Sequence, residues 1–247
     1  MVGRTWRCTV LAGIAATAFC YLNTARAEEA VGSKETSPLS AANSNLQREY
    51  ARLAQLLNSD DVFGKREAAE SLLKVRPGDV ASADTRKLIA RGYRSVAMAE
   101  HGPDKNAAIQ GLVIWGGKYS VPVLIDLLER EQLKVPAELF DGLATLKDPR
   151  GAEAVSRQLG NFFNHDAAVR ALRKMGATAE ETLIKAAPSN DARVSLSAIE
   201  LLGEVGTENS LELLAKAAKS RNPEVREAAK LATKSIRERS RKVVPQP

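Results

Sequence analysis

Residues that end and start helices recur along this chain at a nearly constant interval. Gly117, Asp148, Gly176 and Gly206 follow one another at intervals of roughly thirty residues, and each interval holds two helical segments. One pair of short helices cannot bury its own apolar side, whereas a stack of pairs shares a continuous core. The spacing therefore predicts an all-α fold, an α-solenoid of about five to six antiparallel helix pairs.

Inside the intervals, the apolar residues follow the helical period. Apolar side chains stand at i, i+3, i+4 and i+7 in Val121, Leu124, Ile125 and Leu128. No window alternates with period two for long enough to predict a strand. Aromatic residues make up only 4 % of the chain, which suits helices packed by Leu and Ala better than a β-sandwich.

The predicted helix ends carry residues suited to capping. Asp148-Pro149 and Asn222-Pro223 each place a side-chain acceptor at an N-cap and a proline at the first helical position. Thr178 and Glu181 have the spacing of a capping box. Left-handed C-caps are expected at four glycines that follow apolar runs: Gly116, Gly117, Gly176 and Gly206. Five helices are predicted at Asp84–Glu100, Thr178–Ala187, Asp191–Leu202, Thr207–Lys219 and Pro223–Arg239.

The start of the chain has the layout of an export signal. A short basic start precedes the apolar stretch Thr9–Leu22, and small residues follow in Ala25-Arg26-Ala27. We expect a secretory signal peptide over 1–27, cleaved between Ala27 and Glu28, and a periplasmic or secreted mature protein. An uncleaved anchor is the alternative, although the apolar stretch is shorter than the ~20 residues that a spanning helix needs.

Beyond the signal, the composition divides the chain into further parts. Residues 28–44 are polar and are predicted to be a flexible linker, 45–240 the repeat domain and 241–247 a C-terminal tail. Both cysteines precede residue 28, so no disulfide is expected in the mature chain. The mature chain has a net charge of +3, because residues 28–218 sum to −3 and residues 219–247 to +6.

The second helices of the predicted pairs resemble HEAT repeats. The segment Asn222-Pro223-Glu224-Val225-Arg226-Glu227-Ala228-Ala229 is similar to the second-helix signature of the short HEAT repeats also found in phycobilisome-lyase-like proteins. Weaker copies begin at Asp166 and Asp191, and Arg66-Glu67-Ala68-Ala69 repeats the Arg-Glu-Ala-Ala motif near the start. The resemblance covers about residues 45–240 and departs from the pattern between Arg76 and Pro103. It implies a superhelix that offers a large surface to other proteins.

No catalytic, cofactor-binding or metal-binding residues are predicted. The two histidines, His101 and His165, are far apart in the sequence, and neither accompanies a cysteine. Asp166 follows His165 directly, but neighbours on a helix do not face each other, and Asp166 is expected to cap. The chain lacks a Gly-x-Ser-x-Gly elbow, and Gly116-Gly117-Lys118 lacks the spacing of a phosphate-binding loop. We therefore expect a protein that is not an enzyme.

Arginines near the start of second helices have two interpretations. Arg66, Arg170, Arg193 and Arg226 recur at this position. In one interpretation they pair with Asp or Asn of a neighbouring turn and hold the repeats in register. In the other, Arg170 and Arg193 line the concave face and bind an acidic partner.

Four aromatic residues lie near predicted turns in the middle of the array: Trp115, Tyr119, Phe162 and Phe163. Large apolar side chains are usually buried, so packing within and between repeats is expected for most of them. An exposed Trp115 or Phe162 would instead be a contact anchor for a partner.

Basic residues are frequent near the C-terminus, in Lys230, Lys234, Arg237, Arg239, Arg241 and Lys242. They suit the polar outer face of a terminal repeat and the dipole at a helix C-terminus, or else they bind an anionic partner.

Taken together, the sequence predicts a non-enzymatic protein–protein interaction scaffold or accessory subunit that acts outside the cytoplasm. Its binding residues are expected to be Arg170, Arg193, Trp115 and Phe162. No cofactor, nucleic-acid partner or stable membrane insertion after signal cleavage is expected. The alternative implied by the lyase-like repeats is an enzyme that handles a prosthetic group on a partner protein.

Overall fold

The computed structural model describes residues 38–99, 105–131 and 134–243. The predicted signal peptide, its cleavage site and His101 lie outside these residues. The chain divides into two compact units, 1–52 and 53–247, and helix α2 (Pro38–Leu57) contains the boundary. The part of the predicted linker, 28–44, that the structure describes is helical from Pro38 onward.

The regular secondary structure in the described part of the second unit is all helical, as the periodicity predicts. Its longer helices are α3 (Val62–Leu72), α4 (Ala83–Met98), α5 (Lys105–Gly111), α6 (Val121–Arg130), α7 (Ala137–Leu146), α8 (Pro149–Ser156), α9 (His165–Met175), α10 (Glu180–Ala186), α11 (Ala192–Val205), α12 (Leu211–Ala217) and α13 (Pro223–Val243). Short 3₁₀ or π segments join them: η1 (Pro77–Asp79), η2 (Leu112–Gly116), η3 (Gly117–Ser120), η4 (Arg157–Gly160), η5 (Gly176–Ala179) and η6 (Glu208–Ser210). Helix α13 runs through Arg241 to Val243, so the start of the predicted tail is helical.

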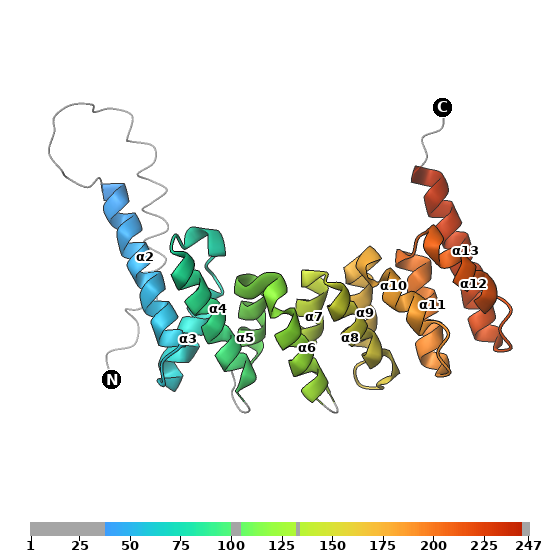
Figure 1. Cartoon of the computed structure of the whole chain (residues 1–247), viewed down its shortest axis with the longest axis horizontal. Helices are drawn as coiled ribbons and strands as arrows, with labels where there is room; N and C mark the ends of the chain where they lie inside the picture. The colour runs from blue at the N-terminus through green and yellow to red at the C-terminus, as the bar shows by residue number, and fades with distance from the viewer. Residues whose placement is uncertain (1–37, 100–104, 132–133, 244–247) are drawn as a thin grey trace, which may run out of the picture. The chain divides into compact units, whose positions relative to one another are not determined.

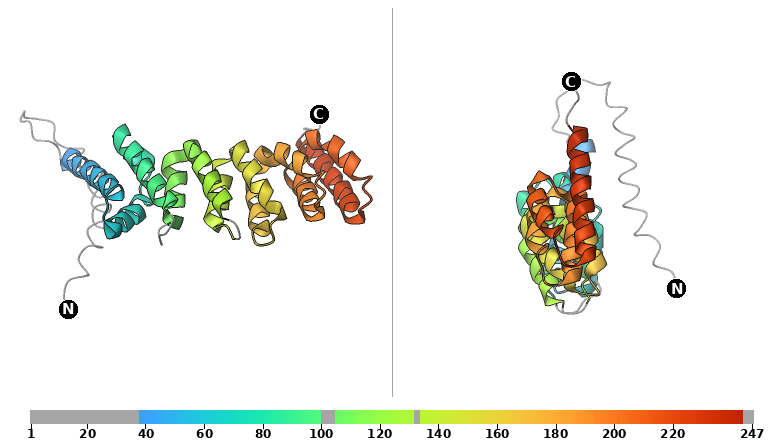
Figure 2. Two further views of the ribbon diagram at one scale, coloured as in Figure 1. Left: turned by 60° about the horizontal axis from the view of Figure 1, so that its bottom comes forward. Right: turned by 90° about the vertical axis from the view of Figure 1, so that its right-hand side faces the viewer.

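These helices form hairpins that stack in two layers (Figures 1 and 2). Helices α5, α7, α9, α11 and α13 pack each against the next in one layer, and α6, α8 and α10 do so in the other. The hairpins α6–α7, α8–α9, α10–α11 and α12–α13 each join the two layers. The predicted all-α solenoid is confirmed.

A core of aliphatic side chains runs along the stack. Val121, Leu124 and Leu128 are buried, as their helical spacing predicts, and Ile125 is half-buried. The bulkiest fully buried side chains are Tyr93 and Phe140. Each hairpin buries its apolar side against its neighbours, which is why the sequence repeats.

The helix ends agree with the predictions where a side chain caps its own helix. Asp148 Oδ1 accepts a hydrogen bond from the Arg150 amide at 3.0 Å, and Asn222 Oδ1 accepts one from the Glu224 amide at 2.9 Å. The capping box of Thr178 and Glu181 is wrong, because Thr178 lies in the 3₁₀ turn η5 and Ala179 precedes α10. Asp166 is not a cap either, since α9 begins after Asn164.

The four glycines predicted to end helices differ in their backbone dihedral angles. Gly117 and Gly176 have positive φ angles of 50° and 64°, which favour glycine, but their ψ angles of −138° and −135° lie outside the left-handed helical region. The left-handed caps predicted at Gly116 and Gly206 are wrong, since their φ angles are −95° and −72°. The left-handed cap of α7 is instead Lys147, with φ 48° and ψ 47°.

The run Lys105–Arg130 is long and apolar enough to span a membrane by length and composition alone. In the structure it comprises α5 and α6, separated by a π-helical segment and the turn at Gly117. Ile109 and Leu124 from this run are fully buried in the core. The run therefore packs as part of the helical array.

Polar side chains tie each hairpin to the next. Asn164, before α9, accepts a hydrogen bond from the Val135 amide in the α6–α7 turn at 3.0 Å. Glu180, at the start of α10, accepts hydrogen bonds from the Thr207 amide and the Ser210 hydroxyl, both at 2.7 Å. These ties cross from one repeat to its successor, so they fix the register of the stack.

Candidate functional site

Arg170 and Arg193 are exposed on neighbouring helices of one layer. Arg170 lies in the middle of α9 and Arg193 in the first turn of α11. Neither side chain makes a hydrogen bond or ion pair with another residue that the structure describes. The expectation that they pair with a neighbouring turn is therefore wrong, and both guanidinium groups are available to a partner.

The pairing between repeats is made by other basic residues. The Arg173 guanidinium binds the Glu204 carboxylate on α11, with Nη2 2.7 Å from Oε1, and lowers the pKa of that carboxyl. Lys174 Nζ donates to Thr145 Oγ1 on α7 at 3.0 Å. Arg226, which is one of the four predicted arginines, instead donates locally, to the Ser220 carbonyl at the turn before its own helix. Sequence reasoning missed Arg173 because it lies outside the second-helix signature.

Phe162 and Phe163 form an exposed aromatic pair in the turn between η4 and α9. Their side chains are 77 % and 62 % exposed, and their rings meet edge to face with centroids 5.5 Å apart. Of the four phenylalanines that follow residue 27, only Phe140 is buried. The expectation that most of these aromatic residues pack in the core is wrong for this pair and for Tyr119, which is 95 % exposed.

The Phe162–Phe163 turn and the start of α11 lie along the same edge of the stack. Segment η4 contacts α11, and His165 Nε2 lies 3.4 Å from the Ser197 hydroxyl of α11. In Figure 1, the turn before α9 and the turn before α11 lie along the lower edge of the stack. We call Phe162, Phe163 and Arg193 the aromatic turn edge. It joins two exposed rings with one unpaired cation.

Trp115 has a structural hydrogen bond as well as a partly exposed ring. Its side chain is half-buried against the core, and its Nε1 donates to the Leu72 carbonyl of α3 at 3.2 Å. This bond uses the only polar atom of the side chain. Trp115 thus packs between repeats, and only one part of its ring faces solvent.

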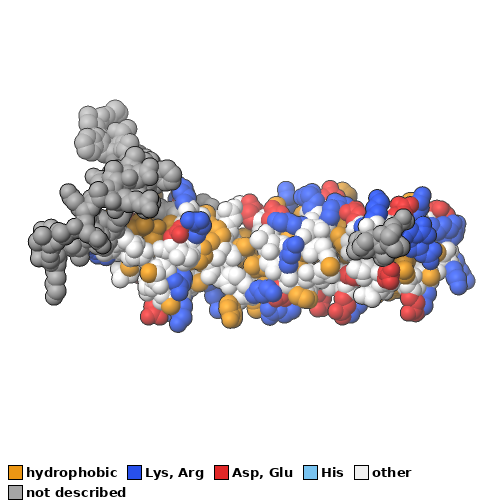
Figure 3. Space-filling view, turned by 90° about the horizontal axis from the view of Figure 1, so that it is seen from above, with side chains coloured by type: hydrophobic (Ala, Val, Ile, Leu, Met, Phe, Trp, Pro, Cys, Tyr) orange, Lys and Arg blue, Asp and Glu red, His pale blue; other side chains and the backbone are white. Residues whose placement is uncertain are grey.

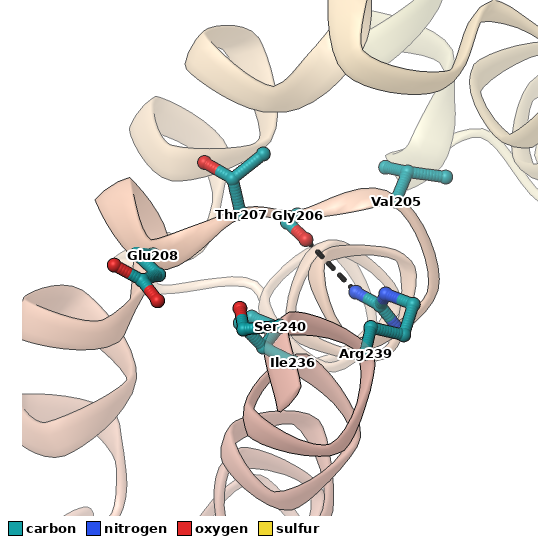
Figure 4. Close-up of a pocket in the computed structure, with 7 residues that line it drawn as sticks. All are labelled: Val205, Gly206, Thr207, Glu208, Ile236, Arg239 and Ser240. Carbon is teal, nitrogen blue, oxygen red and sulfur yellow. Dashed lines mark hydrogen bonds between the residues drawn. The ribbon is translucent and has the colours of Figure 1, made fainter. Parts of the chain in front are cut away.

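Among the basic residues near the C-terminus, Arg239 has a structural role. Its guanidinium donates to the Gly203 and Gly206 carbonyls at the end of α11, the second bond being 2.8 Å long. Figure 4 shows it beside the groove between the α11–η6 turn and α13, with Ile236 on the same helix. Arg239 therefore caps α11 and joins the last two hairpins. Four other basic side chains of α13 are considered below.

Within the described part of the chain, no group of three His, Cys, Asp or Glu side chains could hold a metal ion. His165 and Asp166 do not interact, since His165 Nδ1 lies 2.8 Å from the Leu159 carbonyl and Nε2 faces Ser197. The buried side-chain polar atoms in those ranges all have hydrogen-bond partners. Arg170 and the aromatic turn edge are thus the exposed features that most resemble a binding surface.

The chain is similar to known repeat proteins in part of its sequence. Residues 164–234, from the start of α9 into α13, match the sequence model of HEAT repeats. A designed armadillo repeat protein is similar in structure, with 14 % identity and a TM-score of 0.43 over 76 % of this chain and 99 % of that chain. No curated protein matches the chain in sequence. The repeat match falls on the last of the stacked hairpins described above, so residues 164–234 are similar to HEAT repeats.

Proposed function

We propose that this protein is a non-enzymatic scaffold or accessory subunit that binds another protein through the aromatic turn edge and Arg170. The observation that carries the proposal is the exposure of Phe162 and Phe163 in a chain whose core is built from aliphatic residues. Burying a phenylalanine side chain fully is worth about 1.5–3 kcal/mol. The two rings leave most of that free energy to be gained on contact with a partner.

The charges around the aromatic turn edge indicate the chemistry of the partner. Arg193 lies on this edge and Arg170 lies further along α9, and neither has an intramolecular partner among the described residues. Arginine binds carboxylates through two parallel hydrogen bonds, and aromatic residues with arginine dominate the energy of many interfaces. The partner is therefore proposed to present an apolar side chain to the two rings and carboxylates to the two arginines.

The first experiment identifies the partner and tests the surface. The mature form, residues 28–247, is used to capture proteins from the exported fraction, and the affinity of the captured partner is then measured for each variant. Replacing both Phe162 and Phe163 with Ala should weaken binding at least ~30-fold, as expected for paired anchor residues. Replacing both Arg170 and Arg193 with Ala should also weaken binding, while the melting temperature changes little because neither side chain makes a hydrogen bond or ion pair with a described residue.

Matched variants control for the loss of an exposed ring and of exposed charge. Tyr119→Ala removes the exposed aromatic ring before α6. Arg91→Ala with Arg94→Ala removes two exposed arginines of α4 that have no described partner. These variants should bind normally. The proposal fails if they weaken binding as much as the turn-edge variants, or if the arginine variant melts at a much lower temperature.

The location of the protein outside the cytoplasm is part of the proposal and has its own test. The basic start, the apolar stretch and Ala25-Arg26-Ala27 support it. Mass spectrometry of the protein from its native host should find Glu28 as the first residue in the exported fraction. An intact N-terminus in the cytoplasmic fraction would refute this part and leave the binding surface unaffected.

A further inference from the structure

Helix α13 replaces apolar packing positions of the preceding repeat with cations. The N-caps Asp191 and Asn222 align α11 with α13. In this alignment, the buried residues Ile199 and Gly203 of α11 correspond to Lys230 and Lys234 of α13. The close approach of Gly203 to α13 shows that this side of α11 faces the next hairpin. On α13, no other described helix packs against the same side, as the right-hand view of Figure 2 shows.

Four exposed cations follow one face of α13. Lys230, Lys234, Arg237 and Arg241 stand at i, i+4, i+7 and i+11, so they form a stripe along the helix roughly 16 Å long. We call these four residues the basic stripe. In Figure 3, Lys and Arg side chains gather at the end of the molecule that carries α12 and α13.

The basic stripe is only partly neutralised within the protein. Lys230 pairs with Glu227 at 2.7 Å, and Lys234 lies 3.9 Å from Glu238. Arg237 and Arg241 make no hydrogen bond or ion pair with any residue that the structure describes. The C-terminal half of the stripe thus presents an uncompensated positive charge to solvent.

Capping the stack and matching the helix dipole do not account for this charge. A polar cap needs only polar side chains, and neutral or acidic ones would avoid the repulsion between like charges three or four residues apart. The helix dipole favours cations only within the last turn, which includes Arg241 but not Lys230 or Lys234. The stripe is therefore explained better by a ligand than by the stability of the helix.

We propose that the basic stripe docks the protein onto the surface of a bilayer that contains anionic lipids. Phosphate-bearing headgroups complement the four cations. Leu231, 64 % exposed and adjacent to Lys230, supplies an apolar contact with the boundary between headgroups and acyl chains. A straight helix face with a leucine beside its cations suits a planar, partly apolar surface better than a nucleic acid. The contact is peripheral, and it is separate from the aromatic turn edge, so each surface can be tested without the other.

The test is co-sedimentation of the mature protein, residues 28–247, with vesicles of phosphatidylcholine alone or mixed with phosphatidylglycerol. The wild-type protein should sediment with the mixed vesicles, dissociate from them at high salt, and stay in the supernatant when the vesicles are neutral. Each cation near an anionic surface adds roughly fivefold to binding. Arg237→Gln with Arg241→Gln should therefore weaken binding by roughly 25-fold with little change in the melting temperature, because neither side chain makes a hydrogen bond or ion pair with a described residue. Point variants are preferable to truncation, which would also remove Arg239 and its cap on α11.

Two controls separate the position of the charge from its amount. Lys185→Gln with Lys216→Gln removes the same charge from exposed positions on α10 and α12 and should leave vesicle binding within twofold. Phe162→Ala with Phe163→Ala should bind vesicles normally even if it loses its protein partner. The proposal would be overturned if the Lys185 and Lys216 variant lost as much vesicle binding as the Arg237 and Arg241 variant, or if the wild type bound neutral vesicles equally well. It would also be overturned if the wild type bound an oligonucleotide duplex more tightly than the mixed vesicles.

Discussion

Replacing Glu180 with Ala should destabilise the junction between the last two repeats more than any surface change nearby. The Glu180 carboxylate is 7 % exposed, and its Oε1 accepts hydrogen bonds from the Thr207 amide, the Thr207 hydroxyl and the Ser210 hydroxyl. Ser210 is fully buried, so its hydroxyl would lose its partner without gaining water. Stranding a buried donor costs about 1–3 kcal/mol, and losing the acceptor of the Thr207 amide, which belongs to an exposed residue, adds about 1 kcal/mol. We expect a loss of about 2–4 kcal/mol in the free energy of unfolding.

Two further variants test whether this loss in the free energy of unfolding comes from the hydrogen-bonded oxygen of Glu180. Glu180→Gln keeps a carbonyl oxygen at the same place and should lose only about 1 kcal/mol. Glu181→Ala removes the adjacent carboxylate, which is exposed and pairs with Lys185 at 2.7 Å, and should leave the free energy of unfolding close to that of the wild type.

The assay combines urea unfolding with hydrogen exchange. Unfolding of a repeat array can depart from two-state behaviour, so the exchange rate of the Thr207 amide gives a local reading of the same junction. That amide should exchange much faster in Glu180→Ala than in Glu181→Ala. If Glu180→Ala unfolds at the wild-type urea concentration and protects the Thr207 amide equally, the tie does not hold the repeats together.

Three further predictions concern other contacts between helices. Tyr93→Phe removes a buried 2.6 Å hydrogen bond to a carbonyl of α3 and should cost about 1–2 kcal/mol. Burial also raises the pKa of Tyr93, so the stability of the wild type should fall above pH ~10, where the phenol of the unfolded chain ionises. Alkaline denaturation should show that this part of the fall is absent in the variant. Arg173→Ala should lower the melting temperature at neutral pH, but the difference should disappear in acid. The lowered pKa of Glu204 stabilises the fold fully above its ordinary value of 4.5, and this stabilisation is lost as the pH falls through the lowered folded-state pKa; a difference that persists at pH ~2 would contradict this. Gly203→Val should destabilise the fold by at least ~1 kcal/mol in urea unfolding, since even a Cβ at this position lies 3.0 Å from the Ala232 Cα of α13.

The predictions that proved correct rest on interactions within a few residues. The N-caps at Asp148 and Asn222 needed only a side-chain acceptor two residues before a free amide. The periodic burial of Val121, Leu124 and Leu128 needed only the helical repeat. The stacking of hairpins followed because no single pair can bury its own apolar side.

The predictions that failed involve partners far away in the sequence or residues in turns. Thr178 and Glu181 have capping-box spacing, but Thr178 lies in a 3₁₀ turn and Glu181 lies inside α10. The neighbouring Glu180 binds a turn nearly thirty residues later. No periodic pattern covers a turn, so the exposure of Phe162 and Phe163 could not be read from spacing. Arg170 and Arg173 are equally basic, and only the position of Glu204 on the next repeat decides which of them is paired.

The polar ties from each hairpin to its successor have a mechanical consequence. Asn164, Glu180, Arg173 and Arg239 each reach only one repeat along the stack, so no contact of theirs holds distant repeats together. A pulling force applied to the two ends of 53–247 would act on these junctions in series. Hairpins should then peel away one after another, giving a sawtooth of small, similar force peaks in place of a single rupture.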